Sequence, residues 1–270
     1  MKSLLNKLAG HLRQTKTTSL MAGILAFGPL QSASAQIIYS TGFETPALLA
    51  GFPLAGQDGW VAPPPFSPNA AVVTAAEKRN RKGQRVRVEG ADLEHQDFIE
   101  DVSGGYYDAI GSYRHRVDHD TGGTQTVRVS VDVRLDGRAT PKSNFFSASI
   151  VAIGYNDDGG SEGIGELAIS SDGHVYGYSG QDAVPEFLTG THVALGTWHH
   201  LAIEADFAAR TYSFYVDGAL LGTFDFAPSA TSDVLRRGTM LTYAGPDTAT
   251  DKKADHASNF DNFAIEVVPE

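Results

Sequence analysis

An all-β fold, an antiparallel β-sandwich of two sheets, is what the sequence predicts, and three observations lead to it. Short segments alternate apolar and polar residues, most clearly from Thr126 to Leu135, with the period of a half-buried strand. The 29 glycines and the repeated Asp-Gly and Gly-Gly pairs indicate many tight turns. No segment after Gln36 shows the period of a long amphipathic helix.

Residues 1–35 differ from the rest of the chain. The segment has four basic residues and no acidic one, and residues 20–30 are mostly apolar before Ala33-Ser34-Ala35. This order predicts a secretory signal peptide with an A-x-A cleavage site before Gln36, and a single domain over residues 36–270. The apolar run is too short and too interrupted to span a bilayer, so we expect no membrane span in the mature chain. An N-terminal amphipathic helix of the domain is the alternative interpretation.

Charge and cysteine content limit the partners. The formal net charge of −11 makes nucleic acid an unexpected partner, because an acidic protein is repelled by phosphate backbones. Cysteine is absent, which excludes disulfides and thiolate metal sites. An exported domain held by its core without disulfides is expected in a bacterial protein that is secreted or lies at the cell surface.

The first half of the domain is expected to hold short strands and long loops. A short apolar strand begins at Gln36, and a loop rich in proline and glycine leads to GQDGW at residues 56–60. Residues 61–82, with three consecutive prolines and a basic cluster, indicate a surface loop. Gln84–Glu89 alternates as a strand does, and Gly104–Gly123 is expected to be a long loop around short strands.

Clearer strands fill the second half. Thr126–Leu135 has one apolar face, whereas Phe145–Tyr155 is apolar on both faces and is therefore expected to lie centrally in its sheet. Leu167–Ser170 and His174–Tyr178 are expected to form a hairpin around Ser171-Asp172-Gly173. A penultimate strand is expected at Thr239–Ala244.

The segment Gly196–Phe226 predicts an antiparallel meander. Trp198–Ala205 and Thr211–Val216 alternate in the manner of strands, and Asp217-Gly218 supplies a two-residue hairpin turn that leads into Leu220–Phe224. The two histidines His199 and His200 fall on opposite faces of the first strand, so they cannot join one site.

Two motifs in this chain resemble a known family. GTWHHLAI followed by YSFYVDG resembles the laminin G-like and pentraxin-like branch of the concanavalin A-like lectin/glucanase superfamily. The run from FE to GQDGW resembles the opening of secreted bacterial concanavalin A-like domains and of MAM-type jelly rolls. The resemblance implies a jelly-roll sandwich in which the first strand pairs with the last, here expected at Asn259–Val268.

Signatures of catalysis are missing. The E-x-D-x-x-E run of laminarinase-type glycosidases is absent, and the nearest acids, Glu162, Glu166 and Asp172, are expected to flank a turn with no acid at the middle position. The Arg/Glu/Arg and Gln-x-His strands of alginate lyases, a G-x-S-x-G elbow and H-E-x-x-H are absent too. The sequence therefore predicts no catalytic residue.

Three carboxylates are candidate ligands of a structural calcium ion. If the terminal strands pair, Glu44, Asp58 and Asp261 could converge there. The resemblance implies such a cation for Glu44 and Asp261, while Asp58 is added from its place in the GQDGW turn. Pairing of Glu44 and Asp261 with backbone amides or with Ser/Thr hydroxyls is the alternative. The run RHRVDHD at residues 114–120 could bind a transition metal, but its arginines oppose a cation, and a solvated loop is the simpler interpretation.

Tyrosines are the candidate ligand-binding residues, because sugar sites combine aromatic faces with polar groups. We select Tyr155, Tyr176, Tyr178 and Tyr113, with ordinary packing as the alternative for each. The sequence thus favours an exported, non-enzymatic carbohydrate-binding or adhesion-type module for a polysaccharide or surface glycan. A polysaccharide-cleaving glycoside hydrolase or lyase of the same fold, or a structural envelope or matrix protein, are the alternatives. The ending Val268-Pro269-Glu270 resembles the start of a PEP-CTERM sorting tail.

Overall fold

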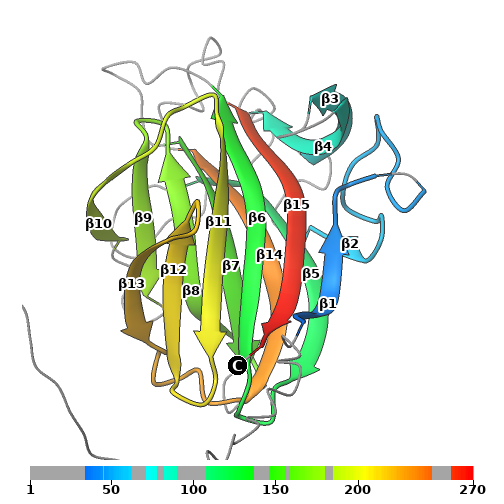
Figure 1. The fold of residues 1–270 in the computed structure, drawn as a ribbon. Helices are drawn as coiled ribbons and strands as arrows, with labels where there is room; N and C mark the ends of the chain where they lie inside the picture. The colour runs from blue at the N-terminus through cyan, green and yellow to red at the C-terminus, as the bar shows by residue number, and fades with distance from the viewer. Residues whose placement is uncertain are drawn as a thin grey trace, which may run out of the picture. The chain divides into compact units, whose positions relative to one another are not determined.

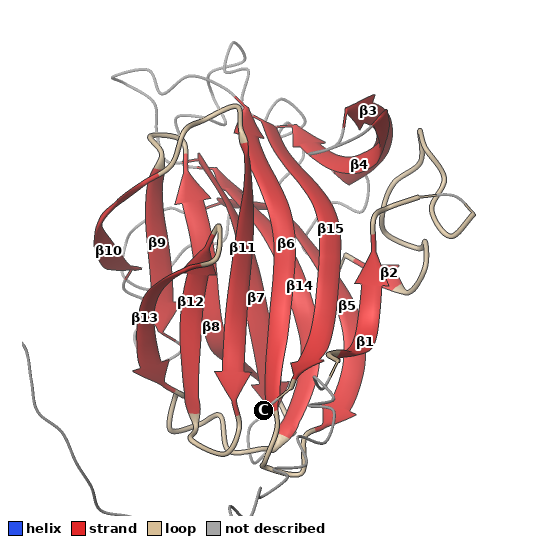
Figure 2. Cartoon of the chain, viewed as in Figure 1, coloured by secondary structure: helices blue, strands red, loops and turns tan. Residues whose placement is uncertain are grey.

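The structure is a computed structural model, and it describes residues 34–44, 46–62, 71–77, 82–89, 108–136, 146–155, 159–179, 185–244 and 257–269. Every regular element in these ranges is a β-strand (Figure 2). Ser34–Glu270 forms one compact unit. Within the described ranges, no helix is long and apolar enough to cross a membrane. The predicted all-β class is confirmed.

The strands form two antiparallel sheets (Figure 1). Sheet A has the order β13-β12-β11-β6-β15-β4-β3, and β1 also pairs with β15. Its strands are β1 (Gln36–Thr41), β3 (Ala71–Glu77), β4 (Lys82–Glu89), β6 (Thr126–Asp136), β11 (Trp198–Asp206), β12 (Thr211–Val216), β13 (Ala219–Asp225) and β15 (Ala257–Val268).

Sheet B has the order β10-β9-β8-β7-β14-β5-β2. Its strands are β2 (Trp60–Val61), β5 (Asp108–Asp120), β7 (Phe146–Tyr155), β8 (Ser161–Ser170), β9 (His174–Ser179), β10 (Pro185–His192) and β14 (Val234–Ala244). The strand predicted to be central, β7, lies in the middle of this order, and its buried side chains point to both faces.

The core lies between the two sheets, because the apolar positions of the alternating strands face one another. The alternate residues Val127, Val129, Val131 and Val133 of β6 are all fully buried, as are Leu201 and Ile203 of β11. Two glycines of sheet B let the sheets approach closely. A Cβ added to Gly165 would lie 2.9 Å from the Tyr212 ring, and one added to Gly238 would lie 2.6 Å from Phe263.

The predicted hairpin turns are confirmed. Asp217 and Gly218 between β12 and β13 have φ angles of 50° and 82°, as a type I′ turn requires at both central residues. Gly173, between β8 and β9, has a φ of 88°. A side chain there would also clash, since an added Cβ would lie 2.6 Å from the backbone oxygen of Val193.

Two predicted loops are strands instead. The surface loop expected at residues 61–82 contains β3, Ala71–Glu77, which pairs with β4. The long loop expected at Gly104–Gly123 contains the 13-residue strand β5. Charged residues and histidines occupy most of β5. The sequence therefore lacks the alternation of apolar and polar residues that would have indicated a strand. Asp97–Val102, whose sequence fits either a strand or a helical turn, lies outside the described residues.

The predicted pairing of the chain ends is confirmed. β1 runs antiparallel to β15, from Gln36 opposite Val267 to Thr41 opposite Phe263. On its other side β15 pairs with β6, and that register shifts between Asp261 and Ala264. Asn262 sits in this shift with a positive φ of 50°, so the DNF sequence marks a β-bulge.

Candidate functional site

Two of the predicted calcium ligands hold neighbouring segments together. Glu44 accepts a hydrogen bond from the backbone amide of Gln84, with 3.1 Å between nitrogen and oxygen. This contact ties the loop after β1 to β4. Asp58 accepts a hydrogen bond of 2.8 Å from the Tyr39 hydroxyl, and its φ of 45° places it in a tight turn.

The third predicted ligand, Asp261, is fully buried at the bulge of β15. Its Oδ1 accepts a hydrogen bond of 2.9 Å from the amide of Asn262. Among the described residues, no three histidine, aspartate or glutamate side chains are grouped so that they could hold a metal ion. The described carboxylates thus form no cation cluster, and calcium stays a prediction of the resemblance alone.

The four selected tyrosines have different surroundings. Tyr113 is 1% exposed and belongs to the core, where its covered ring offers no face for a sugar to stack on. Tyr176 is 6% exposed, which leaves little of its ring for a ligand. Tyr178 pairs with Glu166 through the backbone, and its side chain lies outside the described part of the structure. Tyr155 is half-buried at the end of β7.

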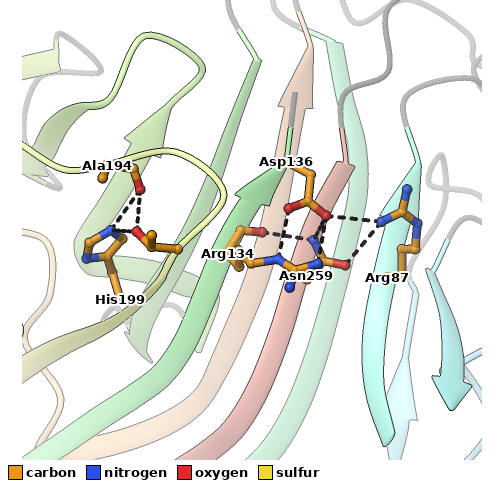
Figure 3. A network of polar contacts seen from close by, with 7 residues as sticks. Arg87, Arg134, Asp136, Ala194, His199 and Asn259 are labelled. Carbon is orange, nitrogen blue, oxygen red and sulfur yellow. Dashed lines mark hydrogen bonds and ion pairs between the residues drawn. The ribbon is translucent and has the colours of Figure 1, made fainter. Parts of the chain in front are cut away.

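The outer face of sheet A is a network of ion pairs, part of which Figure 3 shows. Asp136 accepts hydrogen bonds from Arg134 and Asn259, each at 2.9 Å, and from Arg87 at 3.3 Å. Burial raises the pKa of Asp136, but the contacts with Arg134, Asn259 and Arg87 outweigh burial and hold that pKa below its usual value. Asp136 is therefore a charged anchor of neighbouring strands.

The same face holds two further paired clusters. Arg128 donates hydrogen bonds to Glu204 on β11 and to Glu266 on β15, both at 2.9 Å. Asp132, which is 5% exposed, accepts a hydrogen bond of 2.8 Å from His200. Because acids and bases satisfy one another across β11, β6 and β15, this face is best explained as structural.

The outer face of sheet B carries a different set of side chains, and we call it the sheet B face. Side chains alternate along a strand, so the chain neighbours of core residues point outward. Thr239 on β14, Val151 on β7 and Glu166 on β8 each adjoin core residues and form one cross-strand row. In register, the row continues to Arg114 on β5.

Exposure changes along the sheet B face. Ser147 and Ser149 are 0% exposed and Thr239 is 1% exposed, whereas the Arg116 side chain is 62% exposed. The hydroxyls of Ser147, Ser149 and Thr239 have no hydrogen-bond partner among the described residues. Glu166 lies between the two extremes and is half-buried. The face therefore has a covered end and an open end, with Glu166 near the boundary.

Two of the three acids nearest to the glycosidase pattern lie on a single strand. Glu162 and Glu166 belong to one strand, β8, rather than flanking a turn, and only Asp172 lies in the turn that follows. The middle position, Ile164, is a core residue. The register of β8 against β7 shifts between Gly163 and Gly165. Residues four positions apart share one face of a regular strand. The bulge between Glu162 and Glu166 interrupts that alternation.

Tyr155 joins an arginine cluster at the open end. Its hydroxyl donates a hydrogen bond of 2.7 Å to Asp118 and accepts one of 3.0 Å from Arg116. The guanidinium carbon of Arg236 lies 4.6 Å from the centroid of the Tyr155 ring, which is within the range of a cation–π interaction. Arg116 also bonds Asp118. One ring face of Tyr155 is therefore covered by an arginine.

Sequence reasoning missed most of this surface. Arg114 and Arg116 alternate with His115 and Val117 in the run RHRVDHD, and that period of two could have placed both arginines on one face of a strand. Their neighbour Arg237, the Cα partner of Arg116, could not have been found, because the pairing of β5 with β14 joins segments far apart in sequence.

Solved structures with the same architecture share little sequence with this chain. An endo-1,3-beta-glucanase from Streptomyces sioyaensis has a TM-score of 0.58 at 12% identity, covering 90% of this chain and 100% of its own. A carbohydrate esterase from the Shiga toxin-encoding bacteriophage phi24B has a TM-score of 0.54 at 15% identity, with 87% and 100% covered. An endo-beta-1,4-glucuronan lyase from Trichoderma reesei has 0.51 at 12%, with 86% and 96% covered. At such identities the likeness shows the fold alone.

A comparison with curated protein sequences gives no match. A family profile described as the concanavalin A-like lectin/glucanases superfamily matches residues 105–252, more than half of the 270-residue chain. That range contains most of sheet B and the meander β11-β12-β13. With its two antiparallel sheets and paired chain ends, this chain belongs to the concanavalin A-like lectin/glucanases superfamily.

Proposed function

We propose that this protein binds a polysaccharide at the open end of the sheet B face. The observation that carries the proposal is that one face presents a half-buried carboxylate, Glu166, and, toward its open end, the aromatic ring of Tyr155 with guanidinium groups of β5 and β14. Sugar sites combine aromatic surface with a few planar polar groups that bond hydroxyls in pairs. The charged groups on the outer face of sheet A instead form pairs that join β6 to β11 and β15, as expected of a structural role.

Affinity electrophoresis in gels that contain laminarin, xylan or sodium alginate tests the proposal. The variant Glu166→Gln keeps the shape of the side chain and removes its charge. We expect it to weaken retardation in the gel that retards the wild type by about tenfold, the effect of one lost charge-assisted hydrogen bond. Asp225→Asn, an exposed carboxylate at the end of β13 in sheet A, is the control and should migrate as the wild type does. Unchanged binding by the Glu166 variant contradicts the proposed site.

Cleavage of the polysaccharide is the second candidate function. The observation that favours it is the placement of Glu162 and Glu166 in one strand, since glycosidases use two carboxyl groups. The register shift between the two residues is the observation against it. Release of reducing ends, or absorbance of unsaturated products, should remain at the level of buffer alone if the protein only binds. Release that Glu166→Gln abolishes would establish the enzyme instead.

Export is part of the proposal and rests on the order of residues 1–35. The first strand of the domain begins at Gln36, directly after the expected cleavage site, which suits removal of the leader before folding. Amino-terminal sequencing of the protein recovered from outside the cytoplasm should begin at Gln36. Recovery of the chain with Met1 intact and only in the cytoplasm would contradict export.

Calcium binding is proposed separately, on the resemblance of Glu44 and Asp261 to a cation site of related folds. A ligand that binds only the folded state raises the unfolding midpoint in proportion to its saturation. Thermal unfolding in millimolar calcium and in EDTA measures this directly. Equal midpoints in both solutions would reject calcium without affecting the polysaccharide proposal.

A further inference from the structure

Four arginines gather at the open end of the sheet B face. Arg114 and Arg116 lie on β5, and Arg236 and Arg237 lie on β14. Arg237 is the Cα partner of Arg116, and the register of the two strands shifts next to Arg236. The bulge therefore brings two consecutive arginines of β14 beside two alternating arginines of β5.

Tyr155 lies in the middle of this arginine cluster. Arg116 donates a hydrogen bond to its hydroxyl, and Arg236 covers one face of its ring. Asp118 bonds both Tyr155 and Arg116. The contacts hold the aromatic ring and two guanidinium groups in fixed positions, which reduces the conformational entropy that a ligand would otherwise have to remove on binding.

The charges of the cluster repel one another. Arg237 is half-buried, and its Nε has no hydrogen-bond partner among the described residues. Burial and the positive charges of Arg114, Arg236 and Arg116 lower the pKa of Arg237 to about 10. A chain with a formal net charge of −11 thus concentrates positive charge at one place. An anion bound there would relieve the repulsion.

We propose that this cluster is an anion subsite that takes the carboxylate or sulfate groups of an acidic polysaccharide. The inference rests on the proposed function and names its ligand class. A planar guanidinium presents two parallel donors that match the two oxygens of a carboxylate or sulfate. The half-buried ring of Tyr155 supplies apolar contact for the same sugar unit. A neutral glucan has no group that would offset the repulsion among the arginines.

The experiment measures binding to sodium alginate, dextran sulfate and laminarin, which carry carboxylate, sulfate and no charged group. Arg237→Gln and Arg116→Gln are the test variants. Arg87→Gln is the matched control, because it removes one positive charge from the sheet A network. Thermal unfolding of every variant is recorded alongside. Removing Arg237 relieves repulsion and should leave the midpoint unchanged or raised, so a loss of binding is not a loss of folding.

We expect the wild type to bind one acidic polymer at least tenfold more tightly than laminarin. Each test variant should weaken that binding by about tenfold, and the Arg87 variant should not. Preference for alginate assigns carboxylate as the recognised group, and preference for dextran sulfate assigns sulfate. Laminarin bound as tightly as the acidic polymers, with Glu166→Gln still damaging, overturns the anion subsite and leaves the proposed function standing. Binding to none of the three polymers, nor to xylan, overturns both.

Discussion

The ring of Tyr39 on β1 stacks on the imidazole of His115 on β5, with the ring centroids 3.5 Å apart and the planes 15° from parallel. Both residues hold the GQDGW turn. Tyr39 donates a hydrogen bond to the Asp58 carboxylate, and Nε2 of His115 donates one of 3.0 Å to the Asp58 carbonyl oxygen. Trp60 completes the cluster by donating its indole N–H to the Tyr39 hydroxyl at 3.1 Å. The GQDGW turn is therefore bonded to a strand of each sheet. We call Tyr39, Asp58, Trp60 and His115 the clasp.

This clasp predicts a loss of stability in mild acid. Burial lowers the pKa of His115 and outweighs the opposing effect of Asp58. The unfolded chain takes up the proton more readily than the folded chain does, so stability falls as the pH decreases from about 6.5 toward the lowered value. Urea unfolding at pH 7.5 and pH 5.5 measures the loss. His115→Phe keeps the stacking but should show a smaller loss, whereas the exposed control His192→Gln should match the wild type.

One methyl group added at Gly238 should lower the free energy of unfolding. An added Cβ would lie 2.6 Å from Phe263 and 3.0 Å from Val129, both of which are fully buried residues of the opposite sheet. Gly238→Ala should therefore lower the free energy of unfolding by about 1–3 kcal/mol through overpacking. Gly163 of β8 has no atom within 4 Å of an added Cβ. Gly163→Ala should stay close to the wild type in the same urea titration. Equal stability of the two variants would contradict close packing between the sheets.

The ion pairs of Arg128 on the outer face of sheet A should stabilise the fold. Its guanidinium joins Glu204 and Glu266, whose side chains are each 18% exposed. Arg128→Met keeps most of the apolar stem but leaves two mostly buried carboxylates without this partner. We expect a loss of about 1–2 kcal/mol, less than for a fully buried pair because Arg128 itself is 34% exposed. Arg116→Met, whose pair with Asp118 is exposed, should lose less than half as much.

The strand pattern of the fold could be predicted because it depends on local sequence. Alternation identified β6, β11 and β12 to within one or two residues at their ends, and Asp217-Gly218 identified the turn between β12 and β13. The pairing of the chain ends came from a resemblance rather than from the residues. No local pattern shows which strand pairs with which, because the apolar face of one strand can pack beside the apolar faces of several others.

The site was harder to predict because a shift of one position along a strand moves a side chain from the core face of the sheet to its outer face. Tyr113 was expected to bind a ligand and is in the core, while the next residue, Arg114, points outward. Likewise, the bulge at Gly163–Gly165 fixes the face of Glu166. Bulges depend on contacts across the sandwich, such as that of Gly165 with Tyr212. These contacts are not visible in a single sequence.

Two buried threonines of β14 differ in whether their hydroxyls have a hydrogen-bond partner. Thr242 shares a buried hydrogen bond of 2.6 Å with Ser258 on β15. Thr239 points to the opposite face, is 1% exposed, and its hydroxyl has no hydrogen-bond partner among the described residues. A buried hydroxyl without a partner destabilises the folded state. Thr239 therefore carries a stability defect at the covered end of the sheet B face.

The prediction is that the same substitution has opposite effects at these two positions. Thr239→Val removes the unpaired hydroxyl at nearly constant volume and should raise the free energy of unfolding by about 1 kcal/mol. Thr242→Val leaves the Ser258 hydroxyl unpaired and should lower it by about 1–3 kcal/mol. Urea unfolding measures both changes, and gel retardation by the bound polysaccharide measures function. Because Thr239 is covered, as Ser147 and Ser149 are, its variant should become more stable and leave the retardation unchanged. A Thr239 variant that loses stability would show that its hydroxyl is already satisfied in the folded protein.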